Sequence, residues 1–114
     1  MKALSGVIVC DKHKGSVVVK FNPHEIHGDD GHGVQLHETG EPGSFKTKPA
    51  VMVALREIEA EFHTLPPVPV INEKLRYQID TSNLTKRNFK ISWKSWLHEV
   101  QGIKAISYMV IGEV

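Results

Sequence analysis

The sequence has a single cysteine, Cys10, and no apolar run that approaches the length of a membrane span. One cysteine cannot form an intrachain disulfide, so the class of small disulfide-rich secreted domains is excluded. A transmembrane helix needs about 18 or more apolar residues in succession. The apolar start of the chain also reaches Asp11 and Lys12 too soon for a signal peptide. We therefore expect a cytoplasmic, reducing location.

The chain also lacks an excess of charge of either sign, because it has 14 basic and 13 acidic residues. A formal charge of +1 creates no overall field that would recruit nucleic acid or an anionic membrane. With 40% hydrophobic and 24% charged residues among 114, the composition is that of an ordinary globular protein. We expect a single domain over residues 1–114 and no membrane partner.

Four segments carry the apolar pattern of β-strands, and one long segment does not. The strands are expected at about Leu4–Cys10, Ser16–Phe21, Lys74–Asp80 and Ile103–Ile111. The last of these is apolar on both faces and should be central in its sheet. The polar segment that ends at Gly15 suits a short hairpin loop between the first two. A Gly- and His-rich segment at about 22–46 predicts a loop with one short edge strand at 34–37.

Two other segments have apolar residues at helical spacing. The first, at about 49–63, places five apolar residues on one helical face: Val51, Ala54, Leu55, Ile58 and Phe62. The second, within 84–100, spaces Phe89, Trp93, Trp96, Leu97 and Val100 for a helix ahead of Gly102. A strand through Phe89, Ile91 and Trp93 is the competing interpretation, because aromatic residues favour sheets.

These elements predict an α+β fold. The expected architecture is a two-layer sandwich with a mixed sheet of about 4–5 strands and two helices, in which the last three elements form a parallel crossover. The alternative is a small β-barrel or β-sandwich that carries one helix at about 49–63.

The Gly- and His-rich segment contains groups that could hold a metal ion. Imidazoles and carboxylates are ligands for divalent transition metals, and the candidate ligands are His24, His27, Asp29, Asp30 and His32. Metal sites usually draw their ligands from rigid elements, whereas this segment is rich in glycine. A solvated polar loop is therefore the favoured interpretation, and no cofactor is expected.

Charges of opposite sign are concentrated in two parts of the chain. Residues 24–43 contain only acidic charges, among them Asp29, Asp30, Glu38 and Glu41, whereas residues 84–96 contain only basic charges, at Lys86, Arg87, Lys90 and Lys94. Separated patches of opposite sign favour head-to-tail contact between copies or docking on a bipolar partner.

Three aromatic rings interleave with the basic residues of the second patch. Exposed rings beside lysines can stack on bases while the lysines contact phosphates, which would suit single-stranded nucleic acid. On either a helix or a strand, however, the rings and the lysines segregate to different sides. Burial of the rings in a core is therefore the favoured interpretation. The residues that would bind nucleic acid are Lys86, Arg87, Lys90, Trp93, Lys94 and Trp96.

The sequence thus supports three functions in a definite order. The first is a non-catalytic interaction or assembly module, a homo-oligomer or the binder of another protein, with no catalytic residue of its own. The second is a small protein that binds single-stranded nucleic acid through the basic aromatic segment. The third is a metal-dependent hydrolase that uses the His and Asp residues of the 22–46 segment.

Overall fold

Strands make up the regular structure of the described chain. The computed structural model describes residues 1–60, 77–95 and 101–114, which contain eight strands. Their bounds are β1 Lys2–Cys10, β2 Lys14–Phe21, β3 His24–His27, β4 Gly31–Gly40, β5 Ala50–Ala60, β6 Tyr77–Ser82, β7 Asn88–Ser95 and β8 Gln101–Gly112. In these three ranges no helix has the length and apolar character needed to cross a bilayer.

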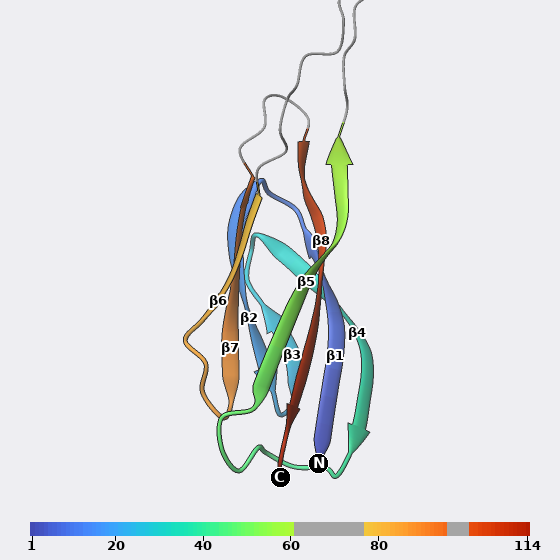
Figure 1. Ribbon diagram of the computed structural model, residues 1–114, viewed down its shortest axis with the longest axis vertical. Helices are drawn as coiled ribbons and strands as arrows, with labels where there is room; N and C mark the ends of the chain where they lie inside the picture. The colour runs from blue at the N-terminus through green and yellow to red at the C-terminus, as the bar shows by residue number, and fades with distance from the viewer. Residues whose placement is uncertain (61–76, 96–100) are drawn as a thin grey trace, which may run out of the picture.

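The strands form two four-stranded antiparallel sheets that pack face to face. One sheet has the order β4-β1-β8-β5 and is called the β1 sheet below; the other has the order β3-β2-β7-β6 and is called the β2 sheet. Figure 1 shows the two layers and places both chain termini at the same end of the sandwich. The fold is therefore an all-β sandwich.

The core lies between the sheets and is filled by alternate residues of their central strands. It includes Leu4, Ile8, Val17, Val19, Phe21, Phe89, Ile91, Trp93, Ile106, Tyr108 and Val110, each at most 3% exposed. Phe89 stacks on Phe21 with ring centroids 5.8 Å apart, and it meets Tyr108 of the opposite sheet edge-on at 6.2 Å. Aromatic contacts therefore join the two layers at their centre.

The prediction of a helix at about 49–63 is wrong. The expected α+β fold and the alternative with one helix both contained this helix, so both are wrong as well. Residues 50–60 form β5, which pairs with β8 from Ala50↔Ile111 to Ala60↔Gln101. Met52 on the solvent side is apolar, as are Val51 and Val53 on the core side, so no alternation of polarity marked this segment as a strand. Irregular pairing between Leu55 and Ile58 further shifts the phase of the pattern. Phe62 lies outside the described residues.

The prediction of a second helix is also wrong over the part of 84–100 that the structure describes. Residues 88–95 form β7, and the competing strand through Phe89, Ile91 and Trp93 is confirmed, with all three side chains buried. The i, i+4 spacing of Phe89 and Trp93 fits a strand equally well, because four is an even number. Residues 96–100, with Trp96, Leu97 and Val100, lie outside the described residues.

The expected connections between strands differ from those observed. The hairpin between the first two strands is wrong, because β1 and β2 lie in different sheets and each pairs with other strands. The parallel crossover and the mixed sheet are wrong as well, since every pair is antiparallel and the chain passes from β7 to β8 by changing sheets. The central position expected for 103–111 is confirmed, as β8 lies between β1 and β5.

Most of the segment at 22–46 is strand rather than loop. It contains β3 and β4, and β4 extends well beyond the short edge strand expected at 34–37. Its glycines do not all mark turns. Gly33 lies within β4, where an added Cβ would overlap the side chain of Ile26 on β3, so glycine lets the edges of the two sheets approach closely.

Candidate functional site

The residues considered as metal ligands do not converge in the described structure. His24 and His27 lie on β3, while His32 lies on β4. His27 Nε2 contacts Glu25 Oε2 at 2.9 Å, and His32 Nδ1 contacts Asp11 Oδ2 at 3.2 Å. Among the described residues, no group of three or more His, Cys, Asp or Glu side chains is arranged to hold a metal ion. The geometry therefore gives no support to the metal-dependent hydrolase.

His24 has a structural contact that makes stability depend on pH. Its Nε2 lies 2.5 Å from the hydroxyl oxygen of Tyr108, and burial lowers the pKa of His24 more than the Glu38 carboxylate raises it. The unfolded chain, with a histidine pKa of about 6.5, then binds more protons than the folded chain at acidic pH. We expect the free energy of unfolding, measured with urea, to fall as the pH drops from about 7 through this value.

A matched pair of variants tests this assignment. His24→Gln should flatten the pH dependence, because the titrating group is gone, whereas His13→Gln removes an exposed imidazole and should preserve it. Curves that stay parallel in wild type and His24→Gln would show that another group is responsible.

The acidic patch is largely neutralised by partners within the chain. Glu38 Oε1 lies 2.9 Å from Lys2 Nζ, and Asp30 Oδ1 lies 2.9 Å from Lys12 Nζ. The contact with Lys12 and the hydrogen bond from Ser16 N lower the pKa of Asp30. Glu41 contacts the N-terminal amino group at 3.3 Å. These carboxylates therefore offer a partner less negative charge than their number indicates. Asp29, in the short turn before β4, is the acid of this patch that forms no ion pair among the described residues.

The basic aromatic segment divides into two faces. Lys90 and Lys94 of β7 alternate with Phe89 and Trp93, whose rings point into the core and are 0% and 2% exposed. Trp93 Nε1 donates to Lys12 O at 2.8 Å. A ring held in this way is not available to stack on a base, so Trp93 cannot play the role that the nucleic-acid hypothesis gives it. Lys86 and Arg87 are exposed in the turn before β7.

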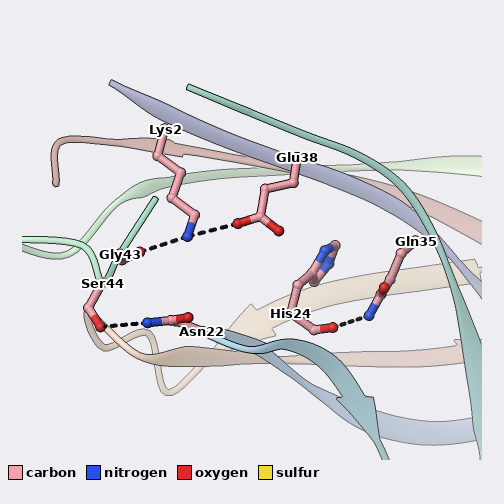
Figure 2. Close-up of polar contacts among 7 residues, drawn as sticks. All are labelled: Lys2, Asn22, His24, Gln35, Glu38, Gly43 and Ser44. Carbon is pink, nitrogen blue, oxygen red and sulfur yellow. Dashed lines mark hydrogen bonds and ion pairs between the residues drawn. The ribbon is translucent and has the colours of Figure 1, made fainter. Parts of the chain in front are cut away.

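A buried lysine forms a polar cluster that the sequence patterns did not predict. The side chain of Lys2 is 1% exposed, and its ammonium group donates to Gly43 O at 2.7 Å as well as contacting Glu38. Figure 2 shows Lys2 between these two partners, with a bond from Asn22 to Ser44 nearby. The cluster fastens the loop after β4 to the start of β1.

Lys2 shares its sheet face with Leu4 and Ile8, since residues two apart along a strand point the same way. This alternation could have revealed the cluster from the sequence, because it places a lysine on the core side of the strand. A charged residue there needs a partner, but no pattern in the sequence identified Glu38 and the Gly43 carbonyl.

Three rows of the outer face of the β1 sheet, on the side of the chain termini, are formed by residues without a formal charge. The next row is charged, because Glu57 of β5 is opposite Ala105 of β8, and Arg56 Nη1 donates to Ser107 Oγ at 3.5 Å. Pairing places Ser5, Met109 and Met52 in one row across β1, β8 and β5. The three uncharged rows comprise Ala3, Ser5, Val7, Val34, His37, Thr39, Ala50, Met52, Ala54, Ser107, Met109 and Ile111. Met52 is 55% exposed, Val34 47% and Met109 41%. Large apolar side chains therefore face solvent on these three rows, beside one charged row.

The outer face of the β2 sheet is different in kind. Its central rows are polar: Lys14 is opposite Lys94, and Ser16 is opposite Ser92. A hollow of about 490 Å³ lies over these rows, and Asp80 of β6 is one of the residues that line it. An exposed face of an antiparallel sheet is usually polar in this way, so the apolar outer face of the β1 sheet is the exception that requires an explanation.

The chain matches no protein-family model, no curated protein and no solved structure in the comparisons made with each.

Proposed function

We propose that this protein is a non-catalytic assembly module that self-associates through the outer face of the β1 sheet. The observation that carries the proposal is the exposure of Met52, Met109 and Val34 on three rows of this face that contain no Asp, Glu, Lys or Arg. Exposed apolar surface of this kind is typical of sites where proteins associate, because covering it removes apolar area from water.

A second copy of the chain is the partner that fits this face best. The three uncharged rows can meet the same rows of a second copy without repulsion, as a two-fold contact requires. Arg56 and Glu57 beside these rows carry opposite charges, so the charged row adds no net charge of one sign. The whole face, with its charged row, has four strands about 4.8 Å apart and roughly eight residues long, which span a projected area of roughly 500 Å². The accessible area of rough side chains exceeds the projection, which brings the face close to the roughly 800 Å² per partner of a stable complex.

The proposal keeps the self-association expected from the sequence but assigns it to another surface. The acidic groups Glu38, Asp30 and Glu41 already have internal partners, so they are poorly suited to attract the basic segment of a neighbouring copy. The basic residues Lys90 and Lys94 lie on the β2 sheet, away from the apolar face. Apolar contact is therefore the main attraction in the proposed assembly.

The described side chains also support a non-catalytic role. Cys10 is buried, and burial, with a smaller effect of Asp11, raises the pKa of its thiol to about 12. The thiolate needed for nucleophilic catalysis would be scarce at neutral pH. His24, the most buried histidine among the described residues, is engaged with Tyr108 rather than with a nucleophile.

Analytical ultracentrifugation over a range of concentrations tests the proposal. We expect wild-type protein to associate reversibly, and Met109→Lys to weaken association by about a hundredfold or more, because the contact would then bury unpaired ammonium groups. Met109 is 41% exposed in a single copy, so the lysine can keep its charge in water and the fold should persist.

Ser92→Lys is the matched control, since it adds the same charge to the outer face of the other sheet. It should associate as wild type does. Raising the salt concentration should leave the wild-type association intact, whereas a contact between the acidic and basic patches would weaken. A wild-type chain that stays monomeric throughout, or a Met109→Lys variant that associates normally, would refute the proposal.

A further inference from the structure

We propose that a basic pocket at one end of the sandwich binds a compact oxyanion of the phosphate or sulfate class. The pocket has a volume of about 440 Å³, within the roughly 300–1,000 Å³ of small-molecule sites. Its charged residues are Lys20, Lys86 and Arg87, and none of its lining residues is acidic. Asn22, Ser44 and Asn88 add polar side chains to the same lining.

The pocket is assembled from three segments that are far apart in the sequence. Lys20 is near the end of β2, where it is opposite Asn88 of β7. The turn after β2 supplies Asn22, whose Nδ2 donates to Ser44 Oγ at 3.2 Å and so joins the loop between β4 and β5 (Figure 2). Lys86 and Arg87 come from the turn before β7.

Hydrogen bonds hold the turn that carries the two basic residues. Thr85 Oγ1 accepts from the backbone N of Arg87 and of Asn88, each at 3.1 Å. Arg87 O in turn accepts from Phe21 N at 3.0 Å, which ties the turn to the end of β2. The backbone positions of Lys86 and Arg87 are thus set before any ligand arrives, which lowers the entropic cost of binding.

The positive charge of this pocket is not neutralised within the described chain. Lys20, Lys86 and Arg87 have no ion pair with any described carboxylate. Glu25 is opposite Lys20 on β3, but its Oε2 contacts His27 Nε2 at 2.9 Å. Three cations that share one hollow repel each other, and a multiply charged anion placed between them would relieve that repulsion.

The chemistry of the lining favours a compact anion over a nucleic-acid strand. Arginine can form two parallel hydrogen bonds to a tetrahedral oxyanion, and lysine adds a mobile point charge. The aromatic residue of the lining, Phe21, is 1% exposed, so the pocket offers no ring on which a base could stack. The amide of Asn22 and the hydroxyl of Ser44 suit oxygen atoms of a small ligand.

Titration with inorganic pyrophosphate at low salt, followed by calorimetry and by ¹H–¹⁵N correlation spectra, tests the site. We expect saturable binding at one site, with the largest shifts at Asn22, Arg87 and Asn88. Arg87→Gln and Lys86→Gln should each weaken binding by about tenfold, since each removes a charged hydrogen-bond donor. Parallel titrations with sulfate and with a single-stranded oligonucleotide distinguish binding of a free oxyanion from binding of the phosphates of a nucleic-acid strand.

Lys14→Gln is the matched control, because Lys14 begins the strand that Lys20 nearly ends, and the two lie about 20 Å apart along it. It makes the same change of charge outside the pocket and should leave the affinity unchanged. All these side chains are exposed, so thermal unfolding should confirm that every variant is folded. An absence of saturation, equal weakening by Lys14→Gln, or binding of the oligonucleotide alone would overturn the proposal.

Discussion

Replacing Phe89 with alanine is expected to lower the free energy of unfolding by about 3–5 kcal/mol, because the change leaves a cavity where the two sheets meet. Phe89 is fully buried and contacts Phe21 in its own sheet and Tyr108 in the other. The loss is a large part of the roughly 5–15 kcal/mol that stabilises a typical domain. Urea denaturation followed by tryptophan fluorescence measures it.

Neighbouring positions show whether this segment behaves as a strand. Ile91→Ala should also cost about 2–5 kcal/mol, because Ile91 is fully buried two residues further along β7. Lys90→Ala lies between them on the outer face and should change stability by less than about 0.5 kcal/mol. A helix built on Phe89 and Trp93 would turn Ile91 away from the core, so a small effect at Ile91 would contradict the strand.

Replacing Lys2 with glutamate is expected to cost about 3–5 kcal/mol, because it would bury a carboxylate against two acceptors. The side chain of Lys2 is 1% exposed and contacts Glu38 and the carbonyl of Gly43. Glutamate at this position would face the same oxygen atoms without a donor. Denaturation with urea at neutral pH should show the loss.

Lys2→Met separates the cost of a wrong charge from the loss of an ion pair. Glu38 is 51% exposed and can return to water, so this variant should lose only about 1 kcal/mol, mainly the bond to Gly43 O. The penalty of Lys2→Glu should shrink in acid, where its carboxyl group takes up a proton. Equal losses in both variants at neutral pH would mean that the ammonium group is not buried against these partners.

The strands that sequence patterns predicted well are those in which one side of the chain is consistently apolar. In β2, Val17, Val19 and Phe21 mark the core side at every second position, and the strand is found there. The pattern failed for β5, where Met52 and Ala54 face outward and are themselves apolar. A segment with two apolar sides carries no period of two, so the helical spacing of Val51 and Leu55 was not contradicted by any polar residue.

Pairing between strands that are far apart in the sequence explains why the sequence did not reveal the candidate surface. Met52 and Met109 are 57 residues apart in the numbering of the chain, and they become neighbours only because β5 pairs with β8. Long-range pairing also decides which charges are neutralised, as with Glu38 and Lys2. Residue types could indicate candidate acids and bases, but their partners follow from the register of β1 and β4.

The exposure of the methionine methyl groups reports directly on self-association through the outer face of the β1 sheet, because the chain has three methionines and two lie on the proposed contact face. With ¹³C-labelled methyl groups and a soluble paramagnetic agent, all three signals should broaden in dilute protein. At high concentration we predict that Met52 and Met109 become protected while Met1, 67% exposed and outside the face, stays accessible. Met52 and Met109 signals that broaden as much as that of Met1 at every concentration would contradict self-association through this face.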